Sequence, residues 1–123
     1  MIVAFTGGRD YQNRAMVHFV IALLDRCGDE MGRGEGYDLR VGDCPTGLDA
    51  MVREHANGTE VFDADWKTHG KAAGPIRNKA MLCHPGTKTP TVDLLIAFPG
   101  GKGTADCVRQ ARELGIAVIE VPA

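Results

Sequence analysis

Short apolar runs of the length of buried β-strands recur along this chain and alternate with helical patterns. The runs lie at residues 2–5, 39–41, 59–62, 94–98 and 116–121, and the helical patterns at about residues 13–27, 47–57, 75–82 and 105–114. Strands that alternate with helices form a parallel sheet with helices on both faces. Because crossovers are right-handed, we predict a Rossmann-like doubly wound α/β fold, strand order 3-2-1-4-5, in a single domain over residues 1–123.

This strand order also predicts where a ligand binds. The first and fourth strands are neighbours at the point where the winding direction reverses, and doubly wound sheets bind ligands outside the strand ends at that point. The turns after these two strands, residues 6–10 and 99–104, should therefore face each other across one crevice. The turns after the second and third strands are expected to flank the same edge.

The turn after the fourth strand is rich in glycine. It reads Gly100, Gly101, Lys102, Gly103, Thr104 and leads into a helix. Glycines allow a ligand to approach the backbone closely, and a helix start offers free N–H groups and the positive end of its dipole. Lys102 adds a positive charge. We predict that this turn binds a phosphate or another anion; the alternative is an ordinary strand-to-helix turn that needs glycine.

The turn after the first strand contains Gly7, Gly8 and Arg9, and it departs from the known nucleotide-binding loops. A GxGxxG pattern beginning at Gly7 would need glycine at the positions of Arg9 and Gln12, and the chain has no GxxxxGK[ST] motif. A guanidinium in such a turn is suited to bidentate phosphate binding. Arg9 is therefore expected either to hold a phosphate or to form a surface salt bridge with Asp10.

Arg77 and Asn78 lie in the predicted third helix. The sequence places Arg77 in the first turn, where a cation opposes the helix dipole unless an anion compensates it. Residues 66–92 contain no acid, so we expect either an external anion or an acid from another turn beside Arg77. Asn78 is expected to orient a base or a sugar hydroxyl, or to bond a neighbouring loop.

Three carboxylates and the single tryptophan are candidates for contacts with a base or ribose. Asp43 is expected to accept hydrogen bonds from ribose hydroxyls, and Asp49 either does the same or forms a capping box with Thr46. Asp106 either stabilises its helix start or acts on a sugar C–N bond through water. Trp66 is expected to stack on a base or to form a pocket wall.

Charge is unevenly distributed along the chain. The formal net charge is −2, but residues 66–92 carry +5, so the remaining residues sum to −7. One electropositive face on an acidic body favours a small anionic ligand over a nucleic-acid track. With only seven aromatic residues, stacking along a nucleic-acid strand is not expected.

Cysteine usage and apolar segments favour a cytoplasmic protein. The four cysteines include no CxxC pair and predict no disulfide framework. Cys83 and His84 have no partner at metal-ligand spacing, and no motif requires a cofactor, so we expect neither metal nor cofactor. The N-terminus does not resemble a signal peptide, and the apolar run 16–24 is too short to span a membrane.

Five pieces of the chain carry a resemblance to a known family. They are residues 3–11, 42–43 with 47–49, 64–67, 70–81 (GKAAGPIRNKAM) and 99–106 (PGGKGTAD). The chain resembles the SLOG superfamily, which includes the LOG phosphoribohydrolases and the DNA-processing protein DprA. It is most similar to the YspA-type branch of short, stand-alone domains found in bacteria and phages.

The resemblance implies a Rossmann-like domain that binds a nucleotide or a nucleotide-derived ligand, as a homodimer or higher homo-oligomer. LOG enzymes use an arginine and the glutamate of GGxGTxxE to cleave a nucleoside monophosphate, and Arg77 corresponds to that arginine. Cys107 stands at the glutamate position, and Asp106 precedes it by one residue, which turns a side chain on a helix by about 100°. The LOG mechanism therefore does not carry over.

Three hypotheses follow. The first is a domain that senses or sequesters a nucleotide-derived small molecule, with its phosphate held by the glycine turns and Arg77. The second is a LOG-like N-glycosidase in which Asp106 or Asp43 acts at the ribose. The third is single-stranded DNA binding, as in DprA.

Overall fold

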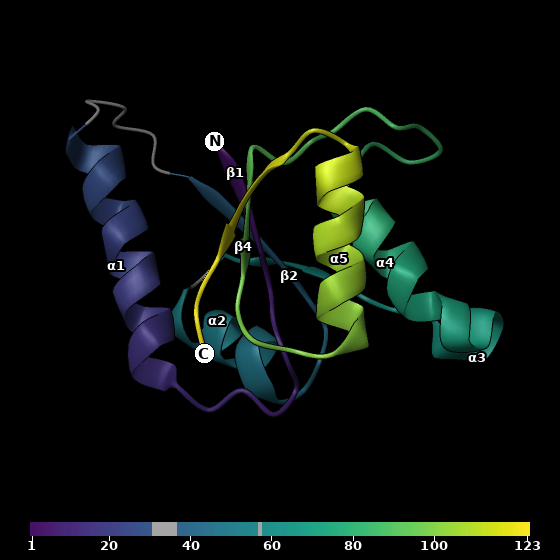
Figure 1. Cartoon of the computed structure of the whole chain (residues 1–123), viewed down its shortest axis with the longest axis horizontal. Helices are drawn as coiled ribbons and strands as arrows, with labels where there is room; N and C mark the ends of the chain where they lie inside the picture. Colours follow the sequence, from purple (N-terminus) through teal and green to yellow (C-terminus); the bar gives the residue numbers. More distant parts are fainter. Residues whose placement is uncertain (31–36, 57) are drawn as a thin grey trace.

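The computed structural model describes residues 1–30, 37–56 and 58–123 and contains one parallel sheet in the predicted order (Figure 1). Its strands are β1 (Ile2–Thr6), β2 (Asp38–Gly42), β3 (Glu60–Phe62), β4 (Leu94–Ala97) and β5 (Ala117–Glu120). They pair in the order β3-β2-β1-β4-β5, each parallel to its neighbour. The predicted α/β fold class and topology are confirmed.

Helices cover both faces of this sheet. They are α1 (Arg14–Glu30), α2 (Gly47–His55), α3 (Trp66–His69), the 3-10 helix η1 (Gly70–Ala72), α4 (Ala73–Leu82) and α5 (Lys102–Glu113). The buried clusters place α1 and α2 on one face and α4 and α5 on the other, and Figure 1 shows α1 and α5 on opposite sides of the strands. Within the described ranges, no helix has both the length and the apolar character that a bilayer crossing requires.

The central strands are buried on both faces, which explains their continuous apolar sequences. Successive side chains of a strand point to opposite faces. In β1, Phe5 packs on the α1–α2 side and Ala4 on the α4–α5 side; in β4, Ile96 and Leu95 divide in the same way. All four side chains are at most 2% exposed. The two apolar clusters, one on each face of the sheet, therefore both pack against β1 and β4. These are the two strands at whose ends a ligand was predicted to bind.

Two helix starts differ from the prediction and change the expected positions of functional residues. α5 begins at Lys102, so Lys102 and Thr104 belong to its first turn and not to a preceding loop. α4 begins at Ala73 because α3 and η1, which were not predicted, lead into it with helical backbone. Arg77 therefore lies in the second turn of α4, where the helix dipole opposes a cation less than the prediction assumed.

Two other predicted boundaries fall partly on residues that the structure does not describe. α1 continues to Glu30, past the predicted end at residue 27, and residues 31–36 of the predicted connection 28–36 lie outside the described residues. α2 ends at His55, and residue 57, its predicted end, also lies outside them.

The predicted capping box at the start of α2 is wrong. Thr46 is the N-cap residue, but its side chain makes no capping hydrogen bond. Instead, Thr46 Oγ1 donates to the Arg9 carbonyl oxygen at 2.9 Å, and Asp49 accepts from the Cys44 N–H at 3.2 Å. The hydroxyl that would have capped the helix ties α2 to the turn after β1.

Backbone hydrogen bonds join the turns at the carboxyl edge into one unit. The Gly8 N–H donates to the Pro99 carbonyl oxygen at 2.9 Å, across the neighbouring ends of β1 and β4. The Leu48 N–H donates to the Gly8 carbonyl oxygen at 3.2 Å. Gly47 lies inside this contact with φ of +70°, and a Cβ there would collide with the Gly8 carbonyl. Only glycine satisfies both the backbone conformation and the close approach.

We expect Gly47→Ala to destabilise the protein more than Gly86→Ala. Gly86 has nearly the same φ, +71°, but its added Cβ would meet nothing within 4 Å. The control variant should therefore lose only the left-handed strain, about 1–2 kcal/mol, whereas Gly47→Ala should lose a further 1–3 kcal/mol, roughly, through overpacking. Urea unfolding followed by circular dichroism measures both values. Equal losses would contradict the contact between the turns.

Candidate functional site

An open cavity of about 890 Å³ lies at the carboxyl edge of the sheet. The turns after β1, β2 and β4 line it together with α4. The structure brings together in this cavity all ten residues predicted to bind phosphate: Gly7, Gly8, Arg9, Arg77, Asn78, Gly100, Gly101, Lys102, Gly103 and Thr104. The two glycine turns and Arg77 thus converge, as the strand order predicted.

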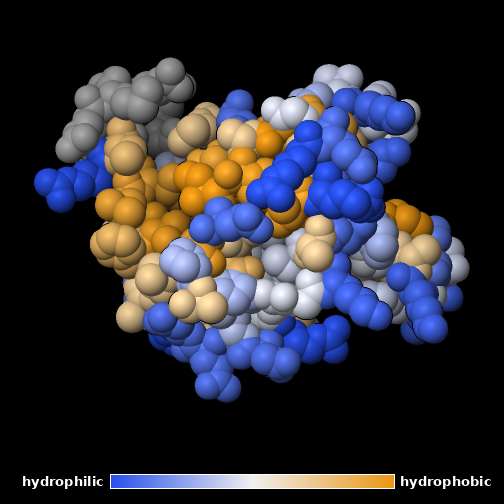
Figure 2. Space-filling view, viewed as in Figure 1, coloured by the Kyte–Doolittle hydropathy of each residue, from blue (hydrophilic) through white to orange (hydrophobic). Residues whose placement is uncertain are grey.

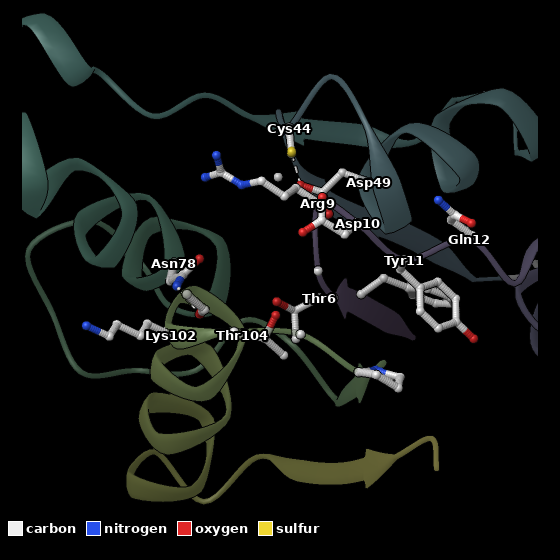
Figure 3. A pocket seen from close by; sticks show the side chains of 18 of the residues that line it. Thr6, Arg9, Asp10, Tyr11, Gln12, Cys44, Asp49, Asn78, Lys102 and Thr104 are labelled. Atoms are coloured by element: carbon white, nitrogen blue, oxygen red, sulfur yellow. Dashed lines mark hydrogen bonds between the residues drawn. The ribbon is translucent and has the colours of Figure 1, made fainter. Parts of the chain in front are cut away.

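Figure 3 shows how the labelled side chains surround this cavity. Arg9, Cys44 and Asp49 lie on one side of it, and Lys102 and Thr104 lie on the other. The first group comes from the turns after β1 and β2 and the start of α2, and the second from the start of α5. A ligand in the cavity therefore contacts elements that are far apart in sequence.

The start of α5 is the part of the cavity best suited to an anion. Its N-cap, Gly101, has no side chain to satisfy the first N–H groups of the helix. The N–H groups of residues 100–104 have no hydrogen-bond acceptor within the described part of the chain. The cavity wall therefore combines these donors with the positive end of the helix dipole and the Lys102 side chain.

Gly100 holds this turn against the turn after β1. A Cβ at Gly100 would collide with Thr104 Oγ1 and would lie 2.7 Å from the Gly8 nitrogen. A larger residue would therefore push the two turns apart. The glycine is required here by backbone packing.

An acid from another turn pairs with Arg77. Arg77 Nη1 donates to Asp43 Oδ1 at 2.9 Å, and Arg77 Nε donates to Asn78 Oδ1 at 3.0 Å. Asp43 Oδ2 accepts from the Ala64 N–H at 3.2 Å. Asp43 itself does not line the cavity. Its carboxylate orients the Arg77 guanidinium at the cavity wall. Of the two partners predicted for Arg77, an external anion or an acid from another turn, the structure therefore contains the acid.

Asp106 is held by several donors and does not line the cavity either. Its oxygens accept from Asn78 Nδ2 at 3.1 Å, Arg109 Nη2 at 2.7 Å and Gln110 Nε2 at 2.8 Å. Partial burial raises the pKa of Asp106, but these hydrogen bonds outweigh it and hold the pKa below its ordinary value. Because Asn78 also donates to the Gly103 carbonyl oxygen at 3.2 Å, this network fixes α4 to the start of α5.

Asp49 is the buried carboxylate of the cavity wall. It is 7% exposed, and its Oδ2 accepts the Cys44 N–H. Burial raises the pKa of Asp49 above its ordinary value, although the Cys44 hydrogen bond and the charges of Arg77 and Arg53 act in the opposite direction. A carboxylate kept in a cavity against its desolvation cost is typical of a functional position.

Trp66 lies outside the cavity. It begins α3, is 54% exposed, and sits where α3 projects from the body of the protein (Figure 1). Residues 66–72 form α3 and η1, and this helical extension leads away from the edge where the turns converge. This corrects the expectation that Trp66 forms a wall of the site.

Several cavity residues were not selected by reasoning from the sequence. They include Thr6, Tyr11, Cys44 and Met81. Thr6 and Cys44 lie where β1 and β2 end, so their place after a predicted strand was the signal that could have found them. Met81 is 1% exposed in the core cluster on the α4–α5 side, and it also lines the cavity.

Cys107, which the resemblance to LOG enzymes aligned with their glutamate, is fully buried. Burial raises the pKa of Cys107 to about 12. The side chain is therefore a neutral thiol at physiological pH and has neither the charge nor the nucleophilicity of a thiolate.

We expect Asp49→Asn to raise the melting temperature at pH 7, because the amide places no charge in the buried position. The pKa of Asp49 is higher in the folded protein than in the unfolded chain, so its unfavourable contribution is present above the folded pKa and disappears as the pH falls toward 3.8. The gain should shrink over the same pH range in thermal unfolding monitored by circular dichroism.

Asp106→Asn is the control with the opposite sign. The pKa of Asp106 is lowered on folding, so its carboxylate stabilises the protein at neutral pH and this contribution is lost in acid. Asp106→Asn should lower the melting temperature at pH 7. A fall for Asp49→Asn as well would show that Asp49 is not a strained, buried charge.

No model of a known protein family matches this chain. The chain is similar to the Gene 61 protein of Mycobacterium phage D29, with 34% identity over 128 aligned residues. The alignment covers 95% of this chain and 93% of the phage protein, so the likeness extends over nearly the full length of both.

Proposed function

Since this chain belongs to the same family as the Gene 61 protein of Mycobacterium phage D29, whose name describes no activity, we propose its function from the geometry of the cavity. The protein binds a nucleotide-derived small molecule and holds its phosphate at the start of α5. The observation that carries this proposal is the set of unpaired N–H groups at residues 100–104, which belong to residues that line a cavity formed by three turns.

The chemistry at this wall favours a phosphate over a neutral ligand. Backbone N–H groups at a helix start bind phosphate oxygens, and the helix dipole favours the negative charge. Lys102 stands at the first position of α5 and contributes an ammonium group. Across the cavity Arg9 is exposed, and its guanidinium has no carboxylate partner among the residues that the structure describes. It is free to bind a second oxygen or a second phosphate.

The rest of the cavity suits a nucleoside. A volume of about 890 Å³ lies within the usual range of small-molecule sites. Tyr11 lines the cavity and packs its ring edge-on against Phe98, with centroids 5.3 Å apart, so this ring is positioned to contact a base. Asp49 supplies a fixed acceptor for a sugar hydroxyl or a base N–H.

Binding without hydrolysis is the better supported form of this function. In the structure Asp106 and Asp43 are engaged by other side chains, and Cys107 is a buried thiol. None of the three is a free carboxylate aimed into the cavity. The resemblance to the SLOG superfamily supports nucleotide binding in the same way. We therefore propose a sensor or sequestering protein, and its free cysteines suit a cytoplasmic location.

Calorimetry with a matched pair of variants tests the proposal. Adenosine and guanosine, their monophosphates and diphosphates, and ADP-ribose are titrated into the wild-type protein, and we expect the phosphorylated compounds to bind at least about 10-fold more tightly than their nucleosides. Lys102→Ala removes only the ammonium group and should weaken the tightest ligand several-fold. Lys102→Pro also removes one N–H donor and should weaken binding by a further factor of about 10.

The proline variant preserves the fold, because the first helical position accepts proline and its N–H has no partner inside the helix. Equal melting temperatures of the two variants are the control for folding. If no compound of the panel binds, the proposal fails. Equal affinities for the alanine and proline variants would instead remove the helix start from the site.

A further inference from the structure

The guanidinium of Arg77 is held at two of its three nitrogens. Nη1 donates to Asp43 Oδ1 at 2.9 Å, and Nε donates to Asn78 Oδ1 at 3.0 Å. The third nitrogen, Nη2, has no hydrogen-bond acceptor among the residues that the structure describes. The side chain is 16% exposed and lines the cavity. Arg77 therefore offers a ligand one donor whose direction is already fixed.

Asp49 is held in a similar way and keeps one free acceptor. Its Oδ2 accepts the Cys44 N–H at 3.2 Å, whereas Oδ1 has no donor in the described part of the chain. The residue is 7% exposed and lines the cavity. Neither Asp49 Oδ1 nor Arg77 Nη2 is sealed in the interior, because within the described ranges Arg40 Nε is the one buried side-chain nitrogen or oxygen without a partner. Both free atoms are thus accessible to a ligand.

Gly42, the last residue of β2, allows these two groups to lie together. A Cβ at this position would stand 2.5 Å from Arg77 Nη1 and 2.8 Å from Asp49 Oδ2. The guanidinium and the carboxylate therefore lie next to each other in the space that a side chain at residue 42 would fill. The cavity presents a donor beside an acceptor at this point, and a hydroxyl group is able to pair with both because it accepts and donates.

We propose that Asp49 and Arg77 bind a ribose hydroxyl of the ligand, so that the site selects ribonucleotides over deoxyribonucleotides. This inference rests on the proposed function and assigns its sugar subsite. The hydroxyl donates to Asp49 Oδ1 and accepts from Arg77 Nη2. A phosphate in the same position would face the carboxylates of both Asp43 and Asp49, and such a placement of like charges is unfavourable. A neutral hydroxyl meets no such repulsion.

The place of Asp49 in the cavity also fits a sugar. In the view of Figure 3, Asp49 lies between Lys102, at the proposed phosphate position, and Tyr11, whose ring is positioned to contact a base. A nucleotide likewise has its ribose between its phosphate and its base. The carboxyl edge of the sheet lies at the bottom of Figure 1, and the same part of the surface in Figure 2 is mostly hydrophilic. A hydrophilic edge suits a ligand whose middle part carries hydroxyl groups.

Calorimetry with ADP, GDP and the 2′-deoxy and 3′-deoxy forms of each tests this subsite. For the diphosphate that binds more tightly, removal of one of the two hydroxyls should weaken binding to the wild-type protein at least about 10-fold, because Asp49 and Arg77 are left without a partner. In Asp49→Asn the amide oxygen takes the Cys44 N–H and the amide nitrogen faces the cavity, so the acceptor becomes a donor. This variant should bind the ribo and deoxy forms within about 3-fold of each other.

Lys102→Ala is the matched control. It weakens the phosphate contact and should lower the affinity for ribo and deoxy forms alike, so the ratio of their affinities should keep its wild-type value. Thermal unfolding of Asp49→Asn shows whether the variant is folded, and we expect it to melt above the wild-type protein at pH 7. Equal affinity of the wild-type protein for the ribo and both deoxy forms would overturn this proposal alone, and so would a wild-type ratio in Asp49→Asn. If no diphosphate binds, the proposal fails together with the proposed function.

Discussion

The hydrogen bond from the Gly8 N–H to the Pro99 carbonyl oxygen, 2.9 Å long, is the contact on which the site depends. It joins the turns after β1 and β4, the neighbouring strands at which the winding direction of the sheet reverses. Each turn alone is a short loop without a pocket. Held together, and joined to the start of α2 by Gly47 and Thr46, they form the walls of one cavity and leave the first N–H groups of α5 without protein partners.

Charges around this cavity are arranged at two depths. At the wall, Arg77 is balanced by Asp43. Behind the wall, Asp106 is balanced by Arg109 and by neutral donors, so these groups fix the positions of α4 and α5. Toward the opening, Lys102 and Arg9 have no such balance in the described part of the chain and remain available to a ligand. Asp49 is the exception, since it is buried at the wall at a cost to its ionised form. A rigid, neutralised frame with free cations at its opening is suited to recognising an anion without reacting with it.

Helix α1 and the C-terminal residues adjoin this site in the sequence. α1 begins at Arg14, directly after the turn that lines the cavity, and β5 is followed by the C-terminal residues, of which Ala123 reaches the cavity. Residues 15–24 of α1 are apolar except His18, but only one side of the helix is buried: Val17 and Ile21 pack in the core, and Phe19 is 57% exposed.

Local sequence determined the fold and brought together the residues that were predicted to bind phosphate. Apolar runs of strand length, glycines at their ends and helices between them depend on neighbouring residues only, and the handedness of crossovers then leaves few arrangements. Because parallel strands end at one edge, the glycine turns lie side by side, and they bring Arg9, Lys102 and Thr104 to the same cavity.

Only the tertiary structure decided which side chains pair with one another. Asp43 and Arg77 are 34 positions apart, and Asn78 and Asp106 are 28 apart. Such pairs depend on where each helix begins and how it is rotated, because a shift of one residue turns a helical side chain by about 100°. The unpredicted α3 and η1 place Arg77 in the second turn of α4, and Trp66 lies on α3, outside the cavity.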